Sequence, residues 1–287
     1  MHFLVTLVAI LASNAIVVSL APSFSAAELR HMISTSGALV LLSSTSYVSQ
    51  EKEVSQGDQE ITAVYGRVDD MEKGSDEKSQ VELTDTSETS IGGMMLFTSG
   101  TTAQPKGLFL SAATPTAQAQ GLIEAWQYTP DDHLLQVLPL HHIHGIMNVL
   151  LTPLLAGSSI EFMFPFNVEA VWKRFAAPFL QVNGINGAYQ AKPPISFFTA
   201  VPTVWARMIE SFSTLSPALQ EAGRAATLRK HLRLNISGSA ALPQPIHDAW
   251  SELSNGNIML ERYGMTEVGM ALSCGLEDVD RVENSVG

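Results

Sequence analysis

Apolar and polar positions alternate in long blocks along the second half of the chain. Five short apolar runs have the length and composition of buried strands, at 134–138, 158–164, 195–200, 232–237 and 258–261. Helical patterns separate them at 115–126, 146–155, 168–175, 202–212, 217–228 and 244–253, and a Gly/Pro/Asn-containing loop is expected at 183–194. Strands that alternate with helices predict an α/β fold with a largely parallel sheet covered by helices.

The first half of the chain has a different pattern. It opens with an apolar run, Phe3 to Ala12, and an amphipathic helix is expected around Glu28, before a strand near 36–42. Residues 50–90 contain many Asp, Glu, Ser, Thr and Gln and few aromatics, so we expect a solvated connector there. The run 91–96 then predicts a further buried strand, which gives a division into 1–49, 50–90 and 91–287.

Composition limits the partners of the protein. The 287 residues are 46% apolar, enough for a sizeable core, and carry a formal net charge of −12. An acidic surface argues against nucleic acid or an anionic membrane as the main partner, although it allows a locally basic ATP site. The lone cysteine, Cys274, has no internal disulfide partner and excludes a cysteine-based metal cluster.

The segment from Phe97 to Gly107 reads Phe-Thr-Ser-Gly-Thr-Thr-Ala-Gln-Pro-Lys-Gly. Small, hydroxylated residues of this kind can turn backbone N–H groups and hydroxyls toward an anion, and Lys106 adds a positive charge. A Walker A loop would need Ser or Thr after Gly-Lys, and a dinucleotide fingerprint would need three spaced glycines. The pattern therefore indicates a phosphate-binding loop of another type, with an ordinary surface turn as the alternative.

From Thr98 to Gly107 the chain resembles the phosphate loop of the adenylate-forming superfamily, T-S-G-T-T-G-x-P-K-G, found in acyl-CoA synthetases, luciferases and peptide-synthetase adenylation domains. Ala103 replaces the last loop glycine, so the loop is strained or reshaped if that position has a positive φ. The resemblance implies that the residues contacting the ATP phosphates are Thr98, Ser99, Gly100, Thr101, Thr102 and Lys106.

A second match is to the Y-G-x-T-E motif of that superfamily, in Tyr263-Gly264-Met265-Thr266-Glu267. The resemblance implies that Tyr263 packs against the adenine, that Gly264, Met265 and Thr266 line the AMP site, and that Glu267 binds Mg²⁺, which prefers oxygen ligands. The alternative is a plain strand-to-helix turn. A third, weaker match is to the adenine-lining segment S-G-G-A-P-L, at Gly238, Ser239, Ala240 and Ala241.

Three histidines lie close together in the segment Leu138-Pro139-Leu140-His141-His142-Ile143-His144-Gly145, and they suggest several roles. A metal site is disfavoured because no Cys, Asp or Glu lies among them to complete the ligand set. In the superfamily this segment is P-L-x-H-x-x-G, which implies that His142 and His144 form a wall of the acyl-substrate pocket. A purely structural role remains the alternative.

Arg262 carries the prediction about substrate. An arginine directly before the motif tyrosine, in Glu-Arg-Tyr-Gly-Met-Thr-Glu, resembles the malonyl-CoA synthetase branch, where it pairs with the second carboxylate of the substrate. A guanidinium binds a carboxylate through two hydrogen bonds, which a fatty-acid tail cannot accept. The alternative is a structural ion pair.

The resemblance also concerns the chain ends. A buried helix and strand precede a segment like Pro22 to Leu29 in acyl-CoA synthetases, which implies that the apolar start is core. A signal peptide is the alternative, although no Lys or Arg precedes the run. Asn284-Ser285-Val286-Gly287 resembles the start of the S-V-G-x-P segment. The chain is thus expected to be an internal part of the large N-terminal domain, without the small C-terminal domain and its catalytic lysine.

Together these motifs predict an ATP-dependent carboxylic acid–CoA ligase that uses Mg²⁺ and coenzyme A, with a small dicarboxylate such as malonate as the acid. No nucleic acid partner and no stable membrane insertion are expected. Two alternatives remain, a catalytically inactive nucleotide- or acyl-binding remnant and a fatty-acid or aryl-acid ligase. Activity of the 287-residue chain by itself is doubtful on this view.

Overall fold

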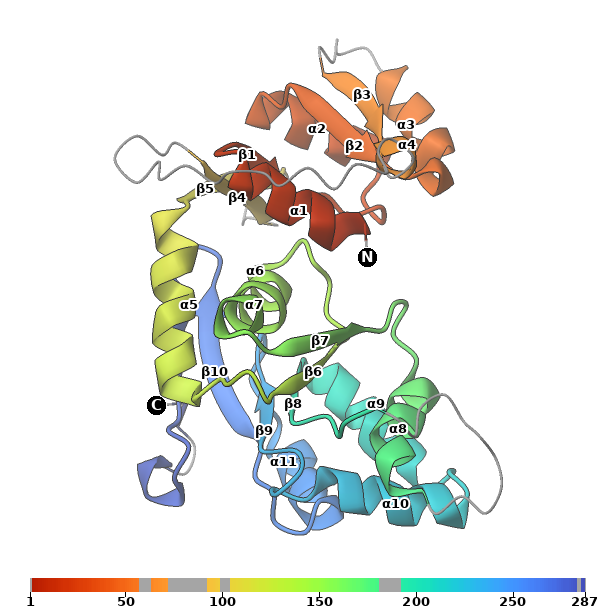
Figure 1. Ribbon diagram of the computed structural model, residues 1–287, viewed down its shortest axis with the longest axis vertical. Coiled ribbons are helices and arrows are strands. Elements are labelled where there is room, and N and C mark those ends of the chain that lie inside the picture. Colours follow the sequence, from red (N-terminus) through yellow and green to blue (C-terminus); the bar gives the residue numbers. More distant parts are fainter. Residues whose placement is uncertain are drawn as a thin grey trace. The chain divides into compact units, whose positions relative to one another are not determined.

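A computed structural model describes residues 2–56, 63–71, 92–98, 104–180, 192–282 and 285–286. The chain divides into two compact units, residues 1–116 and 117–287, and each is described by itself (Figure 1). The boundary falls within helix α5 (Ala113–Trp126) and so divides the segment 91–287 that the sequence pattern treats as one core.

The first unit holds a three-stranded sheet, a two-stranded sheet and four helices among its described residues. Its elements are α1 (His2–Ala12), β1 (Ile16–Val18), α2 (Ala26–Ser36), β2 (Val40–Ser43), α3 (Val48–Ser55), β3 (Val64–Arg67), α4 (Val68–Met71), β4 (Gly93–Thr98) and β5 (Lys106–Ser111). Strand β4 lies between β1, which is parallel to it, and β5, which is antiparallel. Strands β2 and β3 pair in parallel.

Two expectations for this unit need correction. Helix α1 and strand β1 form where the apolar start predicts a helix and a strand, but Leu7 is buried whereas Val5 is 61% exposed. In the described structure, therefore, only part of this helix is core. The expected connector at 50–90 includes most of α3 and all of β3 and α4, so its polar composition does not prevent regular structure at 50–56 and 63–71; the rest of it lies outside the described residues.

The second unit is built on a six-stranded sheet with the order β11-β10-β9-β8-β6-β7. Every neighbouring pair is parallel except β10 and β11. The strands are β6 (His133–Gln136), β7 (Ser159–Phe162), β8 (Phe197–Ala200), β9 (Leu234–Ser237), β10 (Leu260–Met265) and β11 (Gly269–Ser273). The helices are α6 (Ile143–Ile146), α7 (Thr152–Ala156), α8 (Val168–Ala176), α9 (Pro202–Phe212), α10 (Pro217–Thr227) and α11 (Gln244–Leu253). A π-helical stretch, Met147–Leu151, joins α6 to α7.

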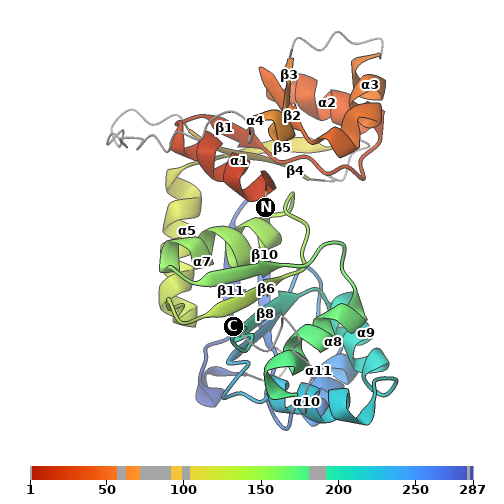
Figure 2. The same cartoon turned by 45° about the vertical axis from the view of Figure 1, so that its right-hand side comes forward.

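Helices cover both faces of this sheet, as the alternating pattern predicts. Phe197 and Phe198 are consecutive on β8 and therefore point to opposite faces. Phe197 packs against Trp126 of α5, with ring centroids 6.3 Å apart, whereas Phe198 packs edge-on against Trp205 of α9 at 5.1 Å. Figure 2 shows α8, α9, α10 and α11 gathered beside one another. The predicted α/β fold with mostly parallel, helix-covered sheets is confirmed.

The run 158–164 forms β7, but the expectation that this strand is buried is wrong. Its residues are half-buried or exposed, because β7 is the last strand of the sheet and pairs with β6 alone. No helix among the residues that the structure describes is both long and apolar enough to cross a membrane.

Candidate active site

Three sequence-predicted residues come together where the central strands of the second unit end. Ser239 follows the carboxyl end of β9, Arg262 lies on β10 beside it, and His144 lies in α6. In open α/β sheets the carboxyl ends of parallel strands are where ligands bind. The fold therefore brings His144 and Arg262, predicted for the acid site, to the expected edge of the sheet beside Ser239, which was predicted for the adenine site.

His144 connects two hydroxyl groups at this edge. Its Nδ1 lies 3.0 Å from Ser239 Oγ, and its Nε2 lies 2.7 Å from Thr199 Oγ1 on β8. Burial lowers the pKa of His144 well below the ordinary value, and the neighbouring Arg262 lowers it further, so the ring is neutral at pH 7. A neutral imidazole carries one ring proton, so the ring donates one of these bonds and a hydroxyl donates the other.

Arg262 completes this chain of hydrogen bonds from the other side. Its Nη2 donates to Ser239 Oγ at 3.1 Å. The side chain is only 4% exposed, and burial lowers its pKa from 12.5 to about 10, so the guanidinium still carries its charge at pH 7. Within the part of the chain that the structure describes, the buried Nε has no hydrogen-bond partner and no carboxylate pairs with Arg262.

The backbone of the 238–239 segment is shaped to accommodate this guanidinium. A Cβ atom on Gly238 would lie 2.3 Å from Arg262 Nε, so only glycine lets the side chain lie against the main chain here. Ser239 adopts φ +68°, a conformation that is costly for a residue with a Cβ. Its hydroxyl bonds to both Arg262 and His144, which offsets that cost and fixes the orientation of both side chains.

The predicted adenine-site residues lie on a β-hairpin that starts from the same strand. Tyr263, Gly264 and Met265 belong to β10, and Thr266 and Glu267 form the turn before β11, so the strand-to-helix alternative is wrong. A Cβ on Gly264 would lie 2.2 Å from the carbonyl oxygen of Gly269, which explains the glycine. Tyr263 is 52% exposed, and Glu267 is exposed at the tip of the hairpin. Both are therefore accessible to a ligand.

The other predicted residues of this unit are also on the surface. Ala240 and Ala241 are exposed after Ser239, and they present a small, flat stretch of backbone. His142 is exposed at the start of α6, with its ring centroid 4.1 Å from that of His141. His133, a further histidine close to this segment in the sequence, pairs with Glu161, 2.6 Å away. Among the described residues, no group of three or more His, Cys, Asp or Glu is placed to hold a metal ion.

The predicted phosphate loop lies in the first unit and is described only at its two ends. Thr98 is the last residue of β4 and pairs across the sheet with Lys106, the first residue of β5. Ser99, Gly100, Thr101 and Thr102 lie outside the described residues. The loop therefore connects two antiparallel strands, with Lys106 exposed at its end.

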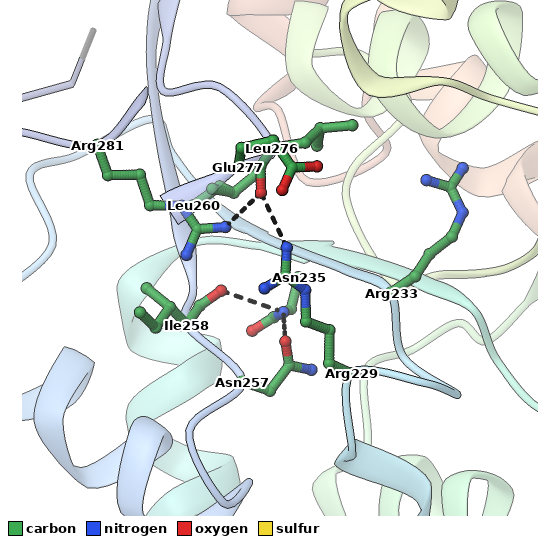
Figure 3. A pocket seen from close by; sticks show the side chains of 9 residues that line it. All are labelled: Arg229, Arg233, Asn235, Asn257, Ile258, Leu260, Leu276, Glu277 and Arg281. Carbon is green, nitrogen blue, oxygen red and sulfur yellow. Dashed lines mark hydrogen bonds between the residues drawn. The ribbon is translucent and has the colours of Figure 1, made fainter. Parts of the chain in front are cut away.

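A polar cavity of about 200 Å³ lies elsewhere in the second unit, beside the amino-terminal ends of β9 and β10 (Figure 3). Arg229 and Arg281 both donate to the carbonyl oxygen of Leu276, and Arg233 pairs with Asp132. The site around Arg262 lies beyond the opposite end of β9, so this cavity is not the predicted acid site.

Thr199 is the one member of the cluster that sequence reasoning missed. It is buried on β8 and bonds to His144 through its hydroxyl. The available signal was a hydroxyl residue near the end of the apolar run Phe197-Phe198-Thr199-Ala200. Such a residue at the carboxyl end of a parallel strand lies where ligands usually bind.

Comparison with known proteins bears on these assignments. The family model of the AMP-binding enzymes matches residues 1–287. The chain belongs to the AMP-binding enzyme family. The adenylate-forming resemblance drawn from the phosphate loop and the Y-G-x-T-E motif is thereby confirmed.

Several known proteins are similar to this chain in sequence or in structure. A CoA ligase of Gibberella moniliformis is 58% identical over 295 residues, covering 100% of this chain and 49% of that protein. The human mitochondrial malonate–CoA ligase is 38% identical over 214 residues, covering 74% of this chain and 35% of that protein. The crystal structure of apo MatB from Rhodopseudomonas palustris superimposes with a TM-score of 0.78 at 26% identity, covering 100% of this chain and 52% of that one. The chain thus spans about half the length of the curated relatives it matches.

Proposed function

We propose that this chain forms the nucleotide- and acid-binding part of an ATP-dependent carboxylic acid–CoA ligase whose acid is a small dicarboxylate such as malonate. In this reaction the acid carboxylate attacks the α-phosphate of ATP and releases pyrophosphate. The thiol of coenzyme A then attacks the acyl-adenylate, forms the thioester and releases AMP. The positions and charges of the bound groups supply most of the catalysis in such a transfer.

The observation that carries the proposal is the incomplete pairing of Arg262. A buried charge without a counter-ion is costly, and proteins normally pair it with a carboxylate. Arg262 has Ser239 as its hydrogen-bond partner, while its Nε is buried and has no partner among the described residues. The distal carboxylate of malonate would supply both the missing charge and the missing acceptor.

The remaining roles follow from the family motifs. Lys106 and Thr98 would bind the ATP phosphates, and Glu267 would hold Mg²⁺ together with phosphate oxygens. Tyr263 and the exposed Ala240–Ala241 backbone would contact the adenine, and His142 and His144 would border the acid. The crystal structure of ATP-bound MatB, with a TM-score of 0.76 at 26% identity, supports ATP as a ligand of this fold.

A fatty or aromatic acid fits this site less well. Such an acid would place an apolar group against the buried guanidinium, whose charge and donors would then remain unsatisfied. The names of the curated relatives agree with this preference, because several of them are malonate–CoA ligases.

Thermal unfolding of the 287-residue chain tests the proposal, since a ligand that binds the native state raises the unfolding midpoint. We expect Mg-ATP to raise it, and malonate to raise it further, while propionate, which lacks the second carboxylate, has little effect. In Arg262→Leu the malonate increment should disappear and the Mg-ATP increment should remain. A chain that responds to neither ligand would instead be the inactive remnant, and an equal response to propionate would exclude the dicarboxylate assignment.

A further inference from the structure

The phosphate loop ends at Lys106, and one side chain from a distant part of the first unit holds the residue just before it. The Nε2 atom of His31 lies 2.9 Å from the carbonyl oxygen of Pro105. A carbonyl oxygen can only accept a hydrogen bond, so the Nε2 of His31 must carry the proton and donate it. This contact joins segments that are 74 residues apart in the chain.

The hydrogen bond acts on the peptide group that begins Lys106. The carbonyl of Pro105 and the N–H of Lys106 belong to one rigid, planar unit. The proline ring fixes φ of Pro105 but leaves free its ψ, the rotation that turns this unit, and the pairing of Lys106 with Thr98 restrains the other side. With His31 holding the carbonyl oxygen, the peptide plane has little freedom left to rotate.

The helix that carries His31 is firmly held. Helix α2 begins with a capping box, in which Ser25 and Glu28 each bond to the backbone of the other, and it ends at Gly37 with φ +63°. Leu29 and Ile33 are buried in the core of the unit. His31 therefore acts from a rigid support, which a side chain on a loose helix could not provide.

We propose that His31 is a positioning residue for the phosphate loop, which it serves by fixing the Pro105 carbonyl and thereby the backbone from which Lys106 reaches the nucleotide. This role rests on the proposed function, in which Lys106 binds the ATP phosphates. His31 itself contacts no substrate. Lys106 is exposed and its side chain is long, so a fixed backbone reduces the conformational freedom that nucleotide binding must remove.

The adjacent residue Arg30 provides a matched control. It lies on the same helix and its Nη1 also donates to a backbone carbonyl, that of Glu53 at the end of α3, at 2.8 Å. Arg30→Leu removes a comparable bond from α2 without touching the loop. His31→Gln keeps a side-chain N–H that can reach Pro105, whereas His31→Leu removes the donor.

The affinity of the 287-residue chain for Mg-ATP, measured by calorimetry, tests the proposal. Without His31, nucleotide binding must order the Pro105–Lys106 backbone, which should weaken binding about five- to tenfold in His31→Leu. His31→Gln should recover most of that loss, and Arg30→Leu should bind like the unaltered chain. In a Lys106→Ala background, His31→Leu should cause no further loss of Mg-ATP affinity, because His31 affects binding only through Lys106.

Amide hydrogen exchange supplies a readout that does not depend on nucleotide. His31→Leu should raise exchange at Lys106 and Gly107, and Arg30→Leu should not. Unchanged exchange there, or unchanged Mg-ATP affinity in His31→Leu while Lys106→Ala binds weakly, would overturn the role of His31 and leave the proposed function intact. If the unaltered chain did not bind Mg-ATP, both the proposed function and the role of His31 would fail.

Discussion

Arg174 and Arg262 are two buried arginines of the same unit, but among the residues that the structure describes only Arg174 has a carboxylate counter-ion. Arg174, on α8, is 1% exposed, and its Nε donates to both carboxylate oxygens of Glu161, at 2.8 and 2.9 Å. Arg262 is 4% exposed and, counting described residues only, makes one hydrogen bond, to the hydroxyl of Ser239. Within the described part of the chain, each arginine has one buried nitrogen without a hydrogen-bond partner, so the difference between them is charge balance.

On the proposed function, this difference separates a structural arginine from one that binds a ligand. Glu161 also contacts His133 and Lys192, and this cluster ties β7 to the residues around it within the fold. Arg262 instead lies at the carboxyl end of the sheet, on a glycine that leaves room for it. A buried charge without a counter-ion is costly for the free protein, and a ligand that carries the opposite charge offsets this cost when it binds.

The largest effect is expected from removing the counter-ion of Arg174. Glu161→Gln leaves a buried guanidinium unbalanced and should lower the free energy of unfolding by about 3 kcal/mol in a urea titration. Glu169→Gln is the control, because Glu169 forms an exposed pair with Lys173 on the same helix as Arg174 and its loss should not be measurable. Equal effects of the two substitutions would show that Glu161 does not balance a buried charge.

The same cluster predicts how stability depends on acid. Arg174, Lys192 and His133 lower the pKa of Glu161 from 4.5 to about 2, despite its partial burial. A lowered pKa in the native state stabilises the protein above pH 4.5, and this contribution is lost as the pH falls toward 2. The difference in unfolding free energy between the unaltered chain and Glu161→Gln should therefore shrink over this range, and a constant difference would contradict the assignment.

Substitution of each arginine itself should also give different changes in stability. Arg262→Met removes a charge that has no counter-ion, so it should leave the free energy of unfolding unchanged or raise it by about 1 kcal/mol. Arg174→Met removes the main partner of Glu161 and should lower the free energy of unfolding by about 2 kcal/mol. Urea titrations of both variants give the values, and an equal loss of stability would mean that Arg262 is structural.

The smallest effect is expected at Ser239. Replacement of Ser239 by glycine removes the conformational cost of φ +68° at this position, but it also removes the hydroxyl that orients Arg262 and His144. Because these changes oppose each other, Ser239→Gly should alter the unfolding free energy by less than about 1 kcal/mol. Malonate affinity should fall about threefold, the loss expected when a side chain is less well oriented. Full affinity in this variant would show that the hydroxyl does not position Arg262.

Much of the fold could be predicted from the sequence, because apolar periodicity reports which elements form. The expected helix at 115–126 is α5, and the expected strand at 195–200 contains β8. Strands β5 and β11 were not predicted, since each follows a motif that reads as a loop and becomes a strand only by pairing with its neighbour. The edge position of β7 likewise depends on strand order, which composition does not encode.

The candidate site was predictable in its residue types but not in its geometry. The motifs point to Arg262, His144 and Ser239, and the structure joins them by hydrogen bonds. The left-handed backbone at Ser239 and the contact of Arg262 with Gly238 depend on how β9 and β10 lie side by side. The bond from His31 to Pro105 spans 74 residues, and no local pattern around either residue indicates it.

A crystal structure of the 287-residue chain with Mg-ATP and malonate would show directly which group supplies the counter-ion of Arg262. We expect the distal carboxylate of malonate to accept hydrogen bonds from the Nε and Nη2 atoms of Arg262, with Ser239 still bound to His144. A malonate whose distal carboxylate lies elsewhere, or a carboxylate of the protein itself paired with Arg262, would contradict this expectation.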